Sequence, residues 1–86
     1  MTAPYDIRFT REAVKDAQVL TPKLKAKLKT VLEQVIAINP AAGKALAGDL
    51  KGFYSYRLTI RDRIVYTVSE SEHIVYIHRA RTHYGD

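Results

Sequence analysis

The sequence predicts an α+β fold, with an N-terminal strand, a two-helix antiparallel hairpin packed on one face of an antiparallel sheet, and a C-terminal three-strand meander. Three observations lead to this prediction. Residues 5–9 alternate apolar and polar side chains, as a half-buried strand does. Residues 10–38 have apolar side chains at helical spacing, and residues 53–79 return to strand-like patterns. A chain of 86 residues is expected to form one domain, over residues 1–86.

Both helices have recognisable starts. Thr10 can cap the first helix, whose apolar positions run from Ala13 to Leu20. Thr21-Pro22 offers a second cap followed by proline at the first helical position. This longer helix is expected to end near Asn39-Pro40, because the residue before a proline is pushed out of the helical region. The short link between the helices predicts an antiparallel hairpin.

Three strands are expected at residues 53–60, 63–69 and 73–79, with connections short enough for hairpins. Their apolar side chains face the helices together if Leu58 lies opposite Tyr66 and Val68 lies opposite Ile74. A shift of one residue would split each apolar set between the two faces. In this register the open face of the sheet presents Arg57, Thr59, Arg63, Val65, Thr67, Val75, Ile77 and Arg79.

The same register places Arg63 directly opposite Arg79. Like charges paired across strands destabilise a sheet by about a few tenths of a kcal/mol or more, so an anionic ligand is expected to relieve the repulsion. His78 is expected to face the helices, and His73 to lie at a hairpin. Both of these histidines are therefore assigned structural roles.

The C-terminal run from Arg79 to Tyr84 contains groups suited to RNA chemistry. If the strand phase continues, Arg81 and His83 project together with Arg79. Guanidinium groups bind phosphate bidentately and stay charged. An imidazole with an ordinary pKa of about 6.5 transfers protons near neutral pH, and Tyr84 can stack on an unpaired base. A frayed, solvated terminus is the alternative interpretation of this run.

The chain is basic, with 14 Lys and Arg against 9 acids, a net charge of +5 and a pI near 9.6. This charge favours nucleic acid or an acidic protein as partner, although many small proteins are simply basic. Cysteine is absent, which excludes disulfides and thiolate chemistry. No apolar run is long enough for a membrane span, and residues 1–7 do not resemble a signal peptide, so a cytoplasmic location without membrane contact is expected. A solvated face is preferred over RNA or ribosome docking for Lys23, Lys25, Lys27 and Lys29.

The sequence resembles the RelE/YoeB superfamily of bacterial toxins, most closely its YoeB (Txe) branch. The resemblance extends from the first strand to the last residues and is specific as a whole, whereas each fragment alone is weak. The matching fragments are Asn39-Pro40, Leu46, Leu50-Lys51-Gly52, Phe53-Tyr54-Ser55, Arg57-Leu58, Arg63-Ile64-Val65-Tyr66 and Arg81-Thr82-His83-Tyr84.

This resemblance implies a RelE-like fold and the toxin of a type II toxin–antitoxin system. Such a toxin is a ribosome-dependent mRNA endoribonuclease that cuts mRNA in the ribosomal A site and inhibits translation. The ribose 2′-OH attacks the adjacent phosphate and leaves a cyclic phosphate and a 5′-OH, with no metal and no cofactor. The implied partners are a cognate antitoxin, the ribosome and its mRNA, with operator DNA bound only through the antitoxin complex.

The resemblance also assigns roles to individual residues. Arg63 matches the catalytic arginine, His83 the histidine that transfers a proton and Tyr84 the terminal tyrosine, while Arg57 matches an arginine that holds phosphate. These four residues are the expected catalytic group. RNA binding is expected at Lys44, Lys51, Arg61, Arg79 and Arg81.

One position departs from the YoeB pattern. Counting back from Gly52 places Lys44 where that branch has a catalytic glutamate, and no Glu occurs between Glu33 and Glu70. The general base is therefore unassigned, and the lysine makes the site more similar to RelE, which relies on basic groups. Asp49 is a carboxylate close in sequence. Two further residues, Gly85-Asp86, follow the tyrosine at which the family pattern often ends.

Two other functions stay open at this point. The first is a toxin of the ParE branch, which has the same fold but poisons DNA gyrase without cutting RNA. The ending His83-Tyr84 argues against this reading. The second is a degenerate member that only binds an antitoxin and acts with it as a co-repressor.

Overall fold

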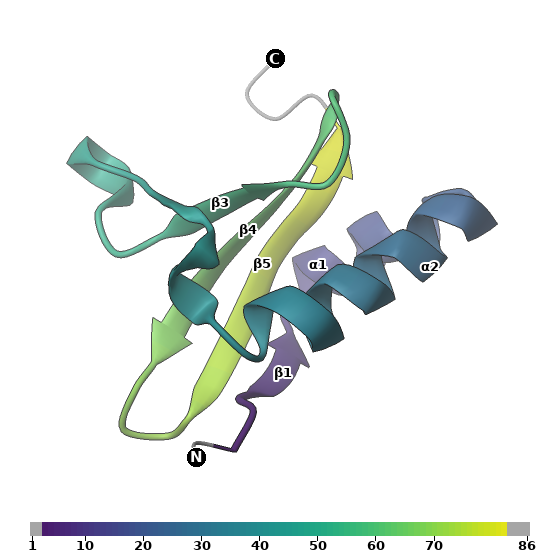
Figure 1. Ribbon diagram of the computed structural model, residues 1–86. Helices are drawn as coiled ribbons and strands as arrows, with labels where there is room; N and C mark the ends of the chain where they lie inside the picture. Colours follow the sequence, from purple (N-terminus) through teal and green to yellow (C-terminus); the bar gives the residue numbers. More distant parts are fainter. Residues whose placement is uncertain (1–2, 83–86) are drawn as a thin grey trace.

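The computed structural model describes residues 3–82, and the side chains as far as residue 80 (Figure 1). Over these described residues, two α-helices and a five-stranded sheet form the fold, in the α+β arrangement that the sequence predicts. The elements are β1 (Asp6–Phe9), α1 (Arg11–Gln18), α2 (Pro22–Val31), η1 (Leu32–Ile36), η2 (Pro40–Ala42), β2 (Lys44–Ala45), η3 (Gly48–Leu50), β3 (Tyr54–Arg57), β4 (Asp62–Ser69) and β5 (Ile74–Thr82).

The sheet is mixed, because one of its pairs is parallel. Its strand order is β1-β5-β4-β3-β2, and β1 runs parallel to β5 while the other pairs are antiparallel. The C-terminal meander is as predicted, but the parallel edge pair and the short strand β2 were not. Alternation along a strand shows which side chains share a face, and it does not show which distant strand lies beside it.

The helices begin where the sequence places their caps. The Thr10 hydroxyl accepts a hydrogen bond from the Ala13 amide at 3.2 Å, and the Thr21 hydroxyl accepts one from the Leu24 amide at 3.2 Å. Each cap satisfies one of the amide groups that have no partner within the helix. The second helix continues from α2 through the π-helical segment η1, which ends shortly before the proline at which an end was predicted.

The core lies between the helices and one face of the sheet (Figure 1). Tyr66 is a fully buried member of this core. Its hydroxyl donates to the Pro40 carbonyl at 2.6 Å and accepts from the Gly43 amide at 3.0 Å. A Cβ atom at Gly43 would lie 2.5 Å from this hydroxyl, so only glycine fits there without movement. These contacts fix the segment between η1 and β2 over the sheet.

The register of β3 on β4 differs from the prediction by four residues. Tyr54, rather than Leu58, lies opposite Tyr66. The strand ends at Arg57 because residues 58–61 form a loop around Asp62, whose carboxylate accepts a 2.7 Å hydrogen bond from the Thr59 hydroxyl. A shift by an even number of residues keeps the same side chains on each face, so the predicted faces of β3 and β4 are correct.

The prediction for β5 is wrong in a more important way, because it places side chains on the wrong face of the sheet. Val65 lies opposite Arg79 and Tyr66 lies opposite Ile77, so a β-bulge leaves His78 as an extra residue. Val75 and Ile77, predicted on the open face, are fully buried in the core, and Arg63 lies opposite Arg81, not Arg79. The predicted faces of β5 were wrong because Ile74 to Ile77 are apolar or aromatic at every position. Such a run does not show which of its side chains face the core.

Candidate functional site

Arginine positions on three neighbouring strands meet at one end of the sheet. Arg63 on β4 lies opposite Arg57 on β3 and, on its other side, opposite Arg81 on β5. Arg57 and Arg63 are both exposed. Among the described side chains, no carboxylate lies within the 4.0 Å ion-pair limit of either guanidinium group. Like charges facing each other across strands repel, so this end of the sheet is suited to an anion.

A cavity of about 370 Å³ opens beside these arginines. Lys44 reaches it from β2, which pairs with β3 so that Lys44 lies opposite Ser55. The cavity therefore brings two guanidinium groups and one ammonium group from three strands to a single hollow. Its lining residues are Ala42, Gly43, Lys44, Leu46, Ser55, Tyr56, Arg57 and Arg63. We call this hollow the cationic cavity.

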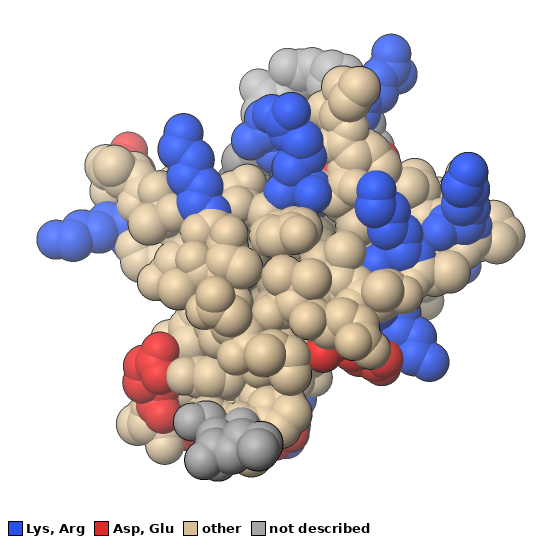
Figure 2. Space-filling view, viewed as in Figure 1, with Lys and Arg blue, Asp and Glu red and all other residues tan. Residues whose placement is uncertain are grey.

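Charge is distributed unevenly over the face drawn in the space-filling view. In the space-filling view, most of the Lys and Arg side chains project from the half that contains the β3–β4 connection and α2, and most of the acidic atoms in view lie in the other half (Figure 2). A surface of this kind attracts polyanions toward one end of the protein. The cationic cavity is suited to phosphate, because guanidinium groups bind its oxygens bidentately.

The wall of the cationic cavity is held by the buried Tyr66. Its hydroxyl accepts a hydrogen bond from the Gly43 amide, and Gly43 immediately precedes Lys44. Burial raises the pKa of Tyr66, so the hydroxyl remains protonated and donates to the Pro40 carbonyl. Lys44 thus follows a backbone segment that is anchored in the core.

Two other predicted RNA-binding residues, Arg61 and Lys51, are not among the residues that line the cavity. Arg61 is exposed in the loop that precedes β4, and Lys51 is exposed after η3. Asp49, the carboxylate considered near this site, is exposed on η3 and does not line the cavity. The structure therefore brings Lys44 to the arginines and does not bring Asp49 to them.

Arg79 has a partner within the chain. Its Nε atom donates to the Asp16 carboxylate at 2.8 Å and its second guanidinium nitrogen donates to the other oxygen at 3.2 Å. The same carboxylate accepts the Ala80 amide at 3.1 Å. Asp16 lies on α1. Its carboxylate accepts the backbone amide of β5 at Ala80, past the point where the pairing with β1 ends. Sequence reasoning did not identify Asp16, although a charged residue between Ala13 and Leu20 on the apolar face of a helix is a signal of such a partner.

His78 occupies the open face of the sheet, which corrects the prediction that it faces the helices. Its Nε2 atom lies 2.9 Å from the Thr67 hydroxyl, and its ring lies 5.0 Å from that of Phe53. Desolvation lowers its pKa, which favours the neutral ring. The bulge is the cause, because it inserts His78 as an extra residue on β5.

His83 and Tyr84, the predicted proton donor and stacking residue, lie outside the described residues. Of Arg81, the backbone register is described, and it places this residue beside Arg63. Sequence reasoning also missed Ser55 and Tyr56 as lining residues of the cationic cavity, although both directly precede Arg57 on the strand that it did identify.

Comparison with known proteins shows the class of protein to which this chain belongs. Residues 7–84 match the family model of the ParE-like toxin of type II bacterial toxin–antitoxin systems. The match spans most of the chain, which therefore belongs to this family of toxins. The assignment to the RelE/ParE superfamily made from the sequence is confirmed.

Solved structures are similar over nearly the whole chain. A chain of the toxin–antitoxin complex RelBE2 from Mycobacterium tuberculosis has a TM-score of 0.85 at 28% identity, covering 93% of this chain and 99% of that one. The YoeB/ParE toxin from Agrobacterium tumefaciens has a TM-score of 0.79 at 27% identity, covering 92% of this chain and 99% of that one. The YoeB dimer from Staphylococcus aureus has a TM-score of 0.76 at 31% identity, covering 95% of this chain and 100% of that one.

These matches confirm the RelE-like α+β fold. The protein is a type II toxin of the RelE/YoeB kind. A search among curated proteins found no match. Within residues 3–82, no helix is both long and apolar enough to cross a membrane.

Proposed function

We propose that this toxin is a ribosome-dependent mRNA endoribonuclease that binds the scissile phosphate in the cationic cavity. The observation that carries the proposal is the convergence of Lys44, Arg57 and Arg63 on one hollow, with no described carboxylate in ion-pair range of either arginine. A site of this kind suits a reaction in which negative charge grows on phosphate oxygens. The family supports the same conclusion.

The proposed reaction is attack of the ribose 2′-OH on the adjacent phosphorus. The O2′–P bond forms and the P–O5′ bond breaks, so the products are a 2′,3′-cyclic phosphate and a 5′-OH. One proton leaves the 2′-OH and one is added to the leaving O5′. Arg57 and Arg63 bind the non-bridging oxygens and stabilise their charge in the transition state. His83 transfers a proton, because an imidazole titrates near neutral pH.

Tyr84 stacks on a base next to the cleaved bond, as aromatic side chains do with single-stranded RNA. Lys44 adds a third cation at the phosphate, at the position where the YoeB branch has a glutamate. Lys51, Arg61 and Arg81 extend RNA binding beyond the cavity through their charge. Arg79 contributes less, because its guanidinium is bound to Asp16.

The proposed partners are an antitoxin, the ribosome with its mRNA, and operator DNA reached through the antitoxin complex. Relatives of this chain have been solved as the RelBE2 complex and as the YoeB–YefM complex from Staphylococcus aureus. A basic toxin suits an antitoxin that covers its cationic surface. We place the protein in the cytoplasm, where ribosomes are found.

A ParE-like inhibitor of DNA gyrase is the second candidate. The description of the matching family as ParE-like favours it, and a relative bears the name YoeB/ParE toxin. The cationic cavity favours the nuclease, since binding to a protein target does not require three cations at one hollow. A co-repressor that only binds antitoxin is the third candidate.

The test is translation of a defined mRNA on purified ribosomes, followed by primer extension at the A-site codon. Wild type is expected to cut, and Arg63→Ala and His83→Ala are expected to lose most cleavage. Lys15→Ala, an exposed change on α1 away from the cavity, is the control. Intact mRNA with wild type, or equal cleavage by both site variants and wild type, would contradict the nuclease. Gyrase trapped on DNA would establish the ParE-like function instead.

A further inference from the structure

Two aromatic rings lie together on the open face of the sheet, the face turned away from the helices. Phe53 directly precedes β3, and His78 is the bulged residue of β5. Their ring centroids are 5.0 Å apart, and the ring planes are tilted by 58°. Because β4 lies between β3 and β5 in the sheet, the two rings meet over the middle strand (Figure 1). We call Phe53 and His78 the aromatic pair.

The aromatic pair is held in place by its neighbours. The Nε2 atom of His78 lies 2.9 Å from the Thr67 hydroxyl on β4. Desolvation lowers the pKa of His78, which favours the neutral ring. Both rings of the pair are half-buried, so part of their surface is open to solvent. Uncharged rings that are already fixed can stack on a base without a large loss of side-chain entropy.

The aromatic pair follows the cationic cavity along the same strands. Arg63, Val65 and Thr67 are alternate residues of β4, so they point to one face at steps of about 7 Å. Ser55 lines the cationic cavity and lies opposite Val65, which connects the two places. Thr67 lies about 13 Å along the strand from Arg63. An RNA strand with a phosphate in the cationic cavity can therefore place a nearby base on the aromatic pair.

Charge sets the direction in which an RNA strand extends over this face. Exposed Glu70 and Glu72 lie in the connection between β4 and β5, beyond the aromatic pair, whereas Arg57 and Arg63 lie at the other end of β4. The phosphates of RNA are attracted to the arginines and repelled by the acidic connection. The uncharged aromatic pair between them suits a base better than a phosphate. Its occupant is therefore a short stretch of single-stranded RNA.

We propose that the aromatic pair is a stacking site for one base of the A-site codon, close to the scissile phosphate in the cationic cavity. The proposal rests on the proposed nuclease function, and this base is a different one from the base assigned to Tyr84. The base lies against Phe53 and His78, and Thr67 keeps the imidazole in position. Every base has a π face, so stacking accepts any of them. The site positions the codon for attack by the 2′-OH and does not select its sequence.

The test combines a toxin variant with removal of a base from the message. Three mRNAs each have an abasic ribonucleotide at one position of the A-site codon, and a fourth has the intact codon. Wild type and Phe53→Leu cleave each of them on purified ribosomes in single-turnover reactions. Phe53→Leu is expected to cut the intact codon about 5- to 50-fold more slowly. At one codon position, base removal is expected to slow wild type by a similar factor and Phe53→Leu much less, because the stacking contact is already lost.

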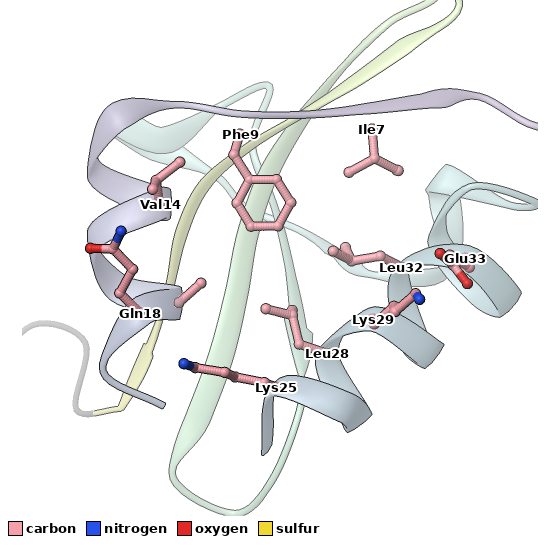
Figure 3. Close-up of a pocket in the computed structure, with 10 residues that line it drawn as sticks. Ile7, Phe9, Val14, Gln18, Lys25, Leu28, Lys29, Leu32 and Glu33 are labelled. Carbon is pink, nitrogen blue, oxygen red and sulfur yellow. The ribbon is translucent and has the colours of Figure 1, made fainter. Parts of the chain in front are cut away.

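Phe9→Leu is the matched control, because Phe9 is the other of the two phenylalanines in the chain. It is 37% exposed and lies on the helix side of the molecule, where it lines a separate apolar hollow between β1, α1 and α2 (Figure 3). Phe9→Leu is expected to depend on the base as wild type does. Phe53→Trp keeps an aromatic face and is expected to retain this dependence too. Thermal unfolding of each variant checks that the fold is retained.

The possible outcomes separate the stacking site from the nuclease function. Base removal that slows wild type and Phe53→Leu equally at all three positions would overturn the stacking site and leave the nuclease intact. The aromatic pair would then be a structural cover for Val65, which is only 3% exposed although it faces away from the helices. The same conclusion follows if Phe53→Leu and Phe9→Leu behave alike. Intact mRNA with wild type would contradict both proposals.

Discussion

Arg63 and Arg79 lie on neighbouring strands, yet their surroundings are opposite. Arg79 is held by both oxygens of Asp16, and the side chains of this pair are 28% and 11% exposed. Arg63 faces Arg57 across the strands, lines the cationic cavity and has no described carboxylate in ion-pair range. One arginine is therefore part of the scaffold, and the other is available to an anionic ligand.

The difference shows how a basic protein divides its cations between structure and binding. A partly buried guanidinium is stabilised by a carboxylate and stabilises the fold in return. Cations that face one another without such a carboxylate destabilise the sheet, and this repulsion is relieved by a phosphate. Changes at Arg63 should affect activity, and changes at Asp16 should affect stability.

The largest effect is expected from Arg63→Ala. Removing a group that stabilises transition-state charge typically lowers kcat by about 10²–10³-fold, and we expect a loss of this size in single-turnover cleavage on the ribosome. The free energy of unfolding is expected to stay equal or to rise by about a few tenths of a kcal/mol, because one of two facing charges is lost. A large fall in stability would contradict the comparison.

Asp16→Ala is expected to have the reverse effect. It leaves the Arg79 guanidinium and the Ala80 amide without their acceptor, and we expect about 1–3 kcal/mol less stability, with the exposure of Arg79 reducing the loss. Urea denaturation measures this, with Asp49→Ala as an exposed-acid control. If Asp16→Ala instead abolished cleavage at unchanged stability, Arg79 would belong with the binding cations.

A smaller loss is expected from Tyr66→Phe. The Pro40 carbonyl and the Gly43 amide lose their partner, at a cost of about 1–2 kcal/mol, and the backbone before Lys44 is no longer anchored. Cleavage should fall less than in Arg63→Ala, because no charge is removed. Tyr76→Phe is the matched control, since that hydroxyl bonds the exposed Glu72. Similar losses in both variants would show that the anchor is unimportant.

The smallest effect concerns His78 and the pH dependence of stability. Desolvation lowers the pKa of this ring from 6.5, so the folded state binds its proton less readily than the unfolded state. The contribution of His78 to the free energy of unfolding is fully present above about pH 6.5, and it falls as the pH drops toward the lowered pKa. His78→Gln should remove that part of the decline, measured by urea denaturation between about pH 5 and pH 7.5. An unchanged pH profile would contradict the assignment.

Predictions from neighbouring residues were correct where a residue type has a single structural role, as at the helix caps. Thr10 and Thr21 cap helices as predicted, because a hydroxyl before a helix accepts an orphan amide wherever the helix packs. The faces of β3 and β4 were also correct. The fold class and the family followed from these patterns together with the motif around Arg57 and Arg63.

Long-range signals were weaker. Nothing within β5 reveals that His78 is a bulged residue, since its neighbours from Ile74 to Ile77 can face either side. The loop that ends β3 early depends on the carboxylate of Asp62, which lies in the connection that was expected to be a short hairpin between residues 60 and 63. The pairing of Arg63 with Arg79 was wrong because the sequence did not show the phase and the bulge of β5, while the catalytic and RNA-binding roles remain predictions.

The sequence by itself determined the order of the first strand, the two helices and the C-terminal meander, the helix starts and the presence of several arginines near the C-terminus, because these depend on neighbouring residues. Only the tertiary structure decided which arginine has a partner. Asp16 and Arg79 are separated by 63 residues, and they meet because α1 packs against the edge of β5. A register one residue away from the expected one, together with a one-residue bulge, then sets Arg81, and not Arg79, beside Arg63. Such contacts depend on packing between distant segments, which local sequence patterns do not encode.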